Sequence, residues 1–84
     1  MAQTSPDLVE LVRGIVLPLV EDKDAVEVTS TVADDSLELI EIKVAPEDAG
    51  KVIGRQGRVI KSIRVLARAA AADYTDVDVE LVED

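Results

Sequence analysis

The chain has 84 residues, a length that limits the fold to one domain with a modest hydrophobic core. It contains neither cysteine nor histidine, which excludes disulfides, thiolate metal sites and the commonest general base. No apolar stretch reaches the roughly 18 residues of a membrane span, and residues 1–7 lack the pattern of a signal peptide. We therefore expect a soluble, cytoplasmic protein.

The net charge of -9 is unevenly distributed along the chain. Residues 51–68 hold six basic residues and no acidic one, whereas the rest of the chain holds all 18 acids and three bases. A basic segment of this kind is typical of a nucleic-acid contact. Because the chain has only one aromatic residue, such a contact would depend on backbone geometry and charge and not on stacking of bases against aromatic rings.

The first predicted helix spans about residues 6–22. The sequence Ser-Pro-Asp at residues 5–7 supplies a good N-cap, a proline at the first helical position and an acid in the first turn. Apolar residues then recur three and four apart over residues 8–20, which predicts one buried helix face. Pro18 lies inside this range, and we expect it to kink or shorten the helix.

Two strands are predicted next. Residues 26–32 alternate between apolar and polar side chains, which is typical of a half-buried strand. Residues 37–44 form the second strand, and a turn at residues 34–36 predicts that the two strands pair as a hairpin. The apolar pattern changes phase after Leu39, and either a β-bulge or burial of both faces would explain the change.

The remaining elements complete an α+β domain. A short helix is predicted to begin near Pro46 and to end before Gly54, and a longer one to run from just after Gly57 to about Ala72. A last strand covers residues 77–81. The order α-β-β-α-α-β predicts helices packed on a three-stranded sheet.

The two later helices meet at the turn Gly54-Arg55-Gln56-Gly57. Glycine at both ends allows the backbone of the turn to approach a sugar-phosphate chain closely. The next helix offers free N–H groups at its N-terminus, and Arg55 and Arg58 add charge-assisted hydrogen bonds to phosphate. The glycine spacing fits neither a P-loop nor a dinucleotide-binding loop.

Residues 52–63, Val-Ile-Gly-Arg-Gln-Gly-Arg-Val-Ile-Lys-Ser-Ile, resemble the signature of a KH domain. The element order resembles the type II KH arrangement, and nearly the whole chain is similar to the small stand-alone bacterial KH proteins of the KhpA family. The resemblance implies a single domain over residues 1–84, with a leading helix at about 6–22 and a KH core at about 25–84. It also implies that the turn clamps about four nucleotides of single-stranded RNA backbone.

The same resemblance implies a cytoplasmic RNA chaperone or post-transcriptional regulator associated with cell elongation and division, and hence with cell shape. It implies pairing of the chain with itself, as a homodimer, or with a larger KH protein of the KhpB/Jag type. The residues expected to contact RNA are Lys51, Ile53, Gly54, Arg55, Gln56, Gly57, Arg58 and Lys61.

Other interpretations stay open. The two glycines could serve only as helix caps, and the basic residues could form an ordinary solvated face, to which Arg64 and Arg68 would belong first. Turn and N-cap chemistry explains the acidic pairs Asp34-Asp35 and Glu47-Asp48, so we expect neither a metal nor another cofactor. The chain could instead be a protein-interaction subunit that uses its apolar first helix. We do not expect an enzyme, because the sequence offers no convincing nucleophile and base.

Overall fold

The computed structural model describes residues 6–33, 37–71 and 76–82. Short 3₁₀ turns separate its helices and strands, and the predicted turn at residues 34–36 lies outside the described residues. The predicted α+β order is confirmed. The elements are α1 (Pro6–Val16), β1 (Glu27–Ala33), β2 (Leu37–Lys43), α2 (Ala49–Ile53), α3 (Arg58–Ala70) and β3 (Asp76–Val82).

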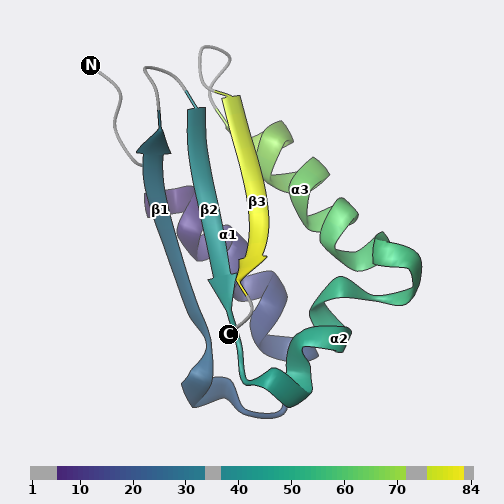
Figure 1. The fold of residues 1–84 in the computed structure, drawn as a ribbon. Helices are drawn as coiled ribbons and strands as arrows, with labels where there is room; N and C mark the ends of the chain where they lie inside the picture. The colour runs from purple at the N-terminus through teal and green to yellow at the C-terminus, as the bar shows by residue number, and fades with distance from the viewer. Residues whose placement is uncertain (1–5, 34–36, 72–75, 83–84) are drawn as a thin grey trace.

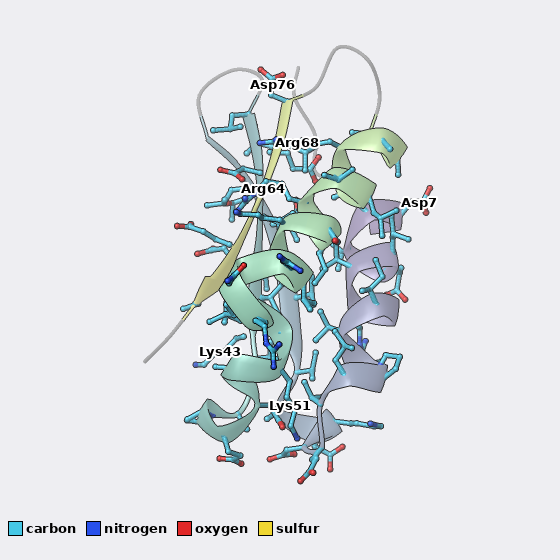
Figure 2. The ribbon with its side chains drawn as sticks, turned by 90° about the vertical axis from the view of Figure 1, so that its right-hand side faces the viewer. Asp7, Lys43, Lys51, Arg64, Arg68 and Asp76 are labelled. Atoms are coloured by element: carbon cyan, nitrogen blue, oxygen red, sulfur yellow. The ribbon has the colours of Figure 1, made fainter. Side chains whose placement is uncertain are left out.

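The three strands form one mixed sheet in the order β1-β2-β3. β1 pairs with β2 in antiparallel fashion, with Ser30 opposite Ile40, and β2 pairs with β3 in parallel, with Ile40 beside Val79. The helices lie on one side of this sheet and leave its other face without helices (Figures 1 and 2). The core therefore fills the space between a single helical layer and one face of the sheet.

The core consists mainly of aliphatic side chains from the helices and from one face of β2 and β3, and Val28 of β1 packs against it. Burial of each such side chain contributes about 1.5–3 kcal/mol relative to leaving it exposed. The buried apolar residues of the three helices, β2 and β3 are Leu8, Val12, Val16, Ile40, Ile42, Val52, Ile63, Ala67, Val77 and Val79.

The change of phase in β2 has a simple cause. The pairing of β1 with β2 advances by one residue at a time on both strands, so this ladder contains no bulge. Glu38 and Ile40 are buried on the face that the helices cover, whereas Leu37 and Leu39 are half-buried on the open face. The hydroxyl of Ser30 donates a hydrogen bond to the Glu38 carboxylate. Burial on both faces, with a glutamate in the core, therefore explains the pattern.

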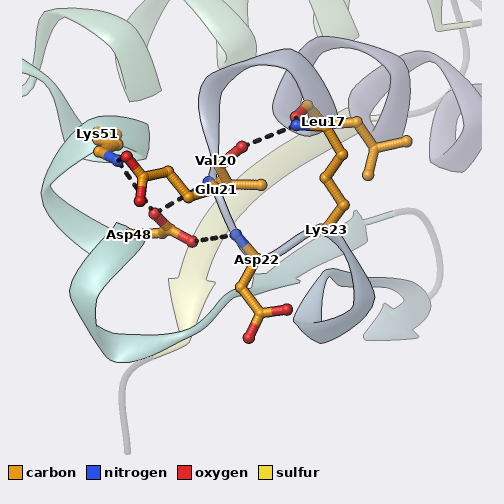
Figure 3. Close-up of polar contacts among 7 residues, drawn as sticks. All are labelled: Leu17, Val20, Glu21, Asp22, Lys23, Asp48 and Lys51. Atoms are coloured by element: carbon orange, nitrogen blue, oxygen red, sulfur yellow. Dashed lines mark hydrogen bonds and ion pairs between the residues drawn. The ribbon is translucent and has the colours of Figure 1, made fainter.

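The first helix is shorter than its apolar spacing predicted. α1 ends at Val16, and the chain continues as a 3₁₀ turn over Leu17–Leu19. Pro18 accounts for the early end, because it lacks an N–H and its ring clashes with the preceding helical turn. The ammonium of Lys23 then donates a hydrogen bond to the carbonyl oxygen of Leu17 over 3.0 Å, which satisfies part of the helix end (Figure 3).

A buried carboxylate joins the start of α2 to the segment between α1 and β1 (Figure 3). Asp48 accepts hydrogen bonds from the backbone N–H of Glu21 at 3.2 Å and of Asp22 at 3.0 Å. The sequence suggested that Asp48 is an N-cap, and it does precede α2, but its side chain does not cap the backbone N–H groups of that helix. The N–H of Asp22, above all, holds the pKa of the Asp48 carboxyl below its usual 3.8, although burial opposes this effect.

We predict that acid weakens this connection. Because the pKa of Asp48 is lower in the folded than in the unfolded state, its contribution to stability is present above pH 3.8 and is lost as the pH falls through the folded value. In urea unfolding at pH 7, Asp48→Asn should have a lower midpoint than wild type. The difference should shrink as the pH is lowered below 3.8. A difference that stays constant into acid would contradict this role of the carboxylate.

Candidate nucleic-acid interface

The turn between α2 and α3 has an unusual backbone. Gly54 has a φ of +76°, Gln56 of +58° and Gly57 of +73°. Glycine adopts these angles freely, but a residue with a side chain in this region costs roughly 1–2 kcal/mol. Gln56 is the only such residue in the described part of the chain. Strain of this kind clusters at functional sites, which directs attention to this turn.

The two glycines of the turn are needed for different reasons. A Cβ atom on Gly54 would lie 2.4 Å from Cγ2 and 2.9 Å from the backbone nitrogen of Val59, so any side chain there would push the turn away from α3. At Gly57 the nearest atom to an added Cβ is Cγ2 of Ile60, at 4.0 Å. Packing against Val59 thus requires glycine at position 54, whereas a Cβ atom at position 57 would meet open space.

Two of the six clustered basic residues, Arg64 and Arg68, contact β3 (Figure 2). Arg64 donates from Nη2 to the carbonyl oxygen of Val79 at 3.0 Å, and its Nε lies 2.9 Å from the Asp78 carboxylate. Arg68 donates from Nε to the carbonyl oxygen of Val77 at 2.9 Å. These contacts cover the outer edge of β3, whose backbone groups have no neighbouring strand. Both arginines are therefore engaged in holding the fold.

Lys51, which the sequence suggested as an RNA contact, is held by two carboxylates (Figure 3). Its ammonium lies 3.3 Å from Oε1 of Glu21 and 3.3 Å from Oδ1 of Asp48. The hydrogen bond with Glu21 is the main reason why the pKa of Lys51 lies above its usual value. Its positive charge is therefore already neutralised in this conformation.

The remaining three basic residues, Arg55, Arg58 and Lys61, surround the turn. All three are exposed, and none takes part in an ion pair within the described residues. Nη2 of Arg58 donates a hydrogen bond to Oε1 of Gln56 at 3.3 Å, so the strained residue holds one of the three cations beside the turn. Three uncompensated positive charges thus lie next to the open space at Gly57.

The structure therefore places around the turn seven of the eight residues that the sequence suggested as RNA contacts. Ile53, at the end of α2, is half-buried beside the turn, and Gln56 is exposed at its tip. Lys51 is the exception, because it is drawn into the contact with Glu21 and Asp48. Local sequence patterns gave no signal for this contact, since Glu21 lies in a connection far away along the chain.

Two other kinds of site receive no support from residues 6–33, 37–71 and 76–82. No helix there is long and apolar enough to cross a membrane. No group of three or more histidine, cysteine, aspartate or glutamate side chains there is arranged to hold a metal ion.

Comparison with known proteins places this geometry in a family. Residues 9–82 match the family model described as the KhpA/KhpB KH domain. The chain belongs to this family. The predicted family is confirmed.

Curated relatives cover most of this KH domain. The RNA-binding protein KhpA of Caldanaerobacter subterraneus subsp. tengcongensis is 55% identical over 62 residues, which are 74% of this chain and 81% of that protein. The RNA-binding protein KhpA of Leifsonia xyli subsp. xyli is 40% identical over 80 residues, 95% of this chain and 97% of that protein.

One solved structure supports the fold alone. The crystal structure of an Aquifex aeolicus Era variant bound to GDP.AlF4- superposes with a TM-score of 0.57 at 22% sequence identity. The match covers 92% of this KH domain and 31% of the Era chain, so the shared fold forms about a third of that larger protein.

We predict that the two glycines of the turn tolerate substitution unequally. Gly54→Ala should cost about 2–4 kcal/mol, because overpacking against Val59 adds to the unfavourable φ. Gly57→Ala should cost only about 1–2 kcal/mol, since the positive φ is the sole penalty. Urea unfolding of the two variants measures both values. Equal losses would show that packing does not fix Gly54.

Proposed function

We propose that this KH domain, one domain over residues 1–84, binds single-stranded RNA without catalysing a reaction. In this proposal the Gly54–Gly57 turn lies against the sugar-phosphate backbone. The observation that carries the proposal is a group of three exposed cations around that turn, Arg55, Arg58 and Lys61, which form no ion pair with any residue that the structure describes. The relatives that are named RNA-binding proteins support it further.

The geometry suggests how a strand would be held. The open space at Gly57 lets a phosphate approach the first backbone N–H groups of α3, a helix of 13 residues whose N-terminus favours an anion. Arg55 and Arg58 would then pair with phosphate oxygens. Ile53 and Ile60 are half-buried and offer aliphatic surface on which bases could lie. Such contacts favour recognition of the backbone with modest base preference.

For the cellular role we propose a cytoplasmic RNA chaperone or post-transcriptional regulator linked to cell shape, as the resemblance to the KhpA family implies. The charge distribution supports this role. Outside residues 51–68 the chain is strongly acidic, so the rest of the surface repels RNA and confines contact to the turn. A small, salt-sensitive contact allows RNA to be released quickly, as a chaperone requires.

We also propose that the KH domain associates with a second copy of itself or with a larger KH protein of the KhpB/Jag type. Three large apolar side chains support association: Leu11 on α1 is 37% exposed, and Val65 and Leu66 on α3 are 64% and 50% exposed. α1 and α3 are packed neighbours. A contiguous patch of exposed apolar side chains marks a protein contact, and we propose that these three side chains form such a patch. The same observation favours the second candidate function, an interaction subunit with little RNA affinity of its own.

We predict that acids in the turn weaken RNA binding strongly. Arg55→Asp/Gln56→Asp replaces attraction by repulsion of phosphate, and should weaken binding of a short single-stranded RNA roughly tenfold or more at low salt. Fluorescence anisotropy measures the affinity, and circular dichroism verifies that the variant folds.

The matched control is Arg13→Asp/Thr31→Asp, which makes the same change of three charge units at exposed positions on α1 and β1. Its affinity should fall much less than that of the turn variant. Equal binding by the turn variant and wild type would contradict the proposed grip and leave the turn as a structural element only.

We predict that an acid on the apolar face of α3 disrupts association. Leu66→Glu places a charge among exposed apolar side chains, so a dimer seen for wild type by light scattering should become a monomer. RNA binding by the turn should persist. A wild type that stays monomeric at every concentration and binds no KhpB-type protein would contradict the proposed association.

A further inference from the structure

Lys51 is the basic residue that precedes the turn on α2, with only Val52 and Ile53 between it and Gly54. Its side chain is 43% exposed, so a ligand in solution can reach the ammonium. The fourth cation near the turn is therefore accessible but already paired. Whether Lys51 can bind a ligand depends on how firmly its two carboxylate partners, Glu21 and Asp48, are held.

The two partners of Lys51 differ sharply in their surroundings. The Asp48 side chain is fully buried and also accepts hydrogen bonds from the backbone N–H groups of Glu21 and Asp22. The Glu21 side chain is 85% exposed, and its carboxylate contacts Lys51 as its only partner within the described residues. An exposed ion pair of this kind adds little to stability. Asp48 is thus bound into the fold, whereas the Glu21 carboxylate can move away at small cost.

We infer that Glu21 sets the RNA affinity of this KH domain by competing with RNA phosphate for the Lys51 ammonium. The inference rests on the proposed function of the Gly54–Gly57 turn. Glu21 is the exposed one of the two partners of Lys51 (Figure 3), and in this inference a phosphate of a strand leaving the turn would take its place. RNA must either displace this carboxylate or bind without Lys51, and both weaken the complex.

The effect of Glu21 on RNA binding differs from the general repulsion of RNA by an acidic protein. Glu47 carries the same charge, is exposed, and lies next to Asp48, but it forms no ion pair with Lys51 within the described residues. Removing either charge lowers the overall repulsion of RNA. Only removal of the Glu21 charge frees a cation to neutralise one more phosphate.

The number of phosphates neutralised is measurable from the salt dependence of binding. For single strands, log K falls with log salt at a slope of about -0.7 per phosphate. With three unpaired cations, wild type should show a slope of about -2.1, and Glu21→Gln, with Lys51 freed, a slope of about -2.8. The affinity ratio of variant to wild type should then grow about 2.6-fold between 200 and 50 mM salt.

The experiment is an anisotropy titration of a short fluorescein-labelled oligouridine over this range of salt. Glu47→Gln is the matched control, and its slope should stay at the wild-type value even if its affinity rises. In the double variant Glu21→Gln/Lys51→Gln the slope should also return to the wild-type value. Asp48 keeps its two backbone N–H donors in that variant, which preserves the fold.

The outcomes separate this inference from the proposed function. If Glu21→Gln has the wild-type slope, or if Glu47→Gln steepens the slope equally, the inference is wrong and the role of the turn is unaffected. If neither wild type nor any variant binds RNA, the proposed function is wrong and the inference falls with it. A steeper slope in Glu21→Gln alone, reversed by Lys51→Gln, supports both.

Discussion

The close approach of Gly54 to Val59 is the constraint on which the candidate site depends. No Cβ atom fits between the two residues, so the end of α2 lies directly against the start of α3. The chain must then reverse within a few residues, and it does so with positive φ angles at Gly54, Gln56 and Gly57. At Gly57 an added Cβ would have its nearest neighbour only at 4.0 Å, and basic residues lie on both sides of this glycine in the sequence.

Of the six basic residues in residues 51–68, three are bound to other parts of the protein and three form no ion pair within the described residues. Arg64 and Arg68 bind the carbonyl oxygens of β3, and Lys51 binds Glu21 and Asp48. The arginine contacts join α3 to the strand that follows it, and the contact with Glu21 joins α2 to the connection between α1 and β1. The cations that remain for a ligand are those nearest the turn. In a chain of net charge -9, this division concentrates the attraction for phosphate in one small area.

The sequence predicted the parts of this account that depend on local patterns. Apolar periodicity predicted the order of helices and strands, and Pro18 predicted a kink or an early end of the first helix. The family was indicated by the resemblance of residues 52–63 and of the element order to a KH domain. It missed features that arise from contacts between distant segments, namely the burial of Glu38 and the capture of Lys51 by Glu21. Periodicity describes which face of an element is apolar, but it does not reveal which charged side chains meet across the fold.

If RNA lies against the Gly54–Gly57 turn, amide chemical-shift mapping by NMR will locate it there. When a short single-stranded RNA is added to the ¹⁵N-labelled protein, the largest shifts should fall on residues 54–61. Amides around Leu11 and Leu66, and those of β1, should change little. Shifts concentrated on the apolar face of α1 and α3, with none in the turn, would contradict the account and favour an interaction subunit.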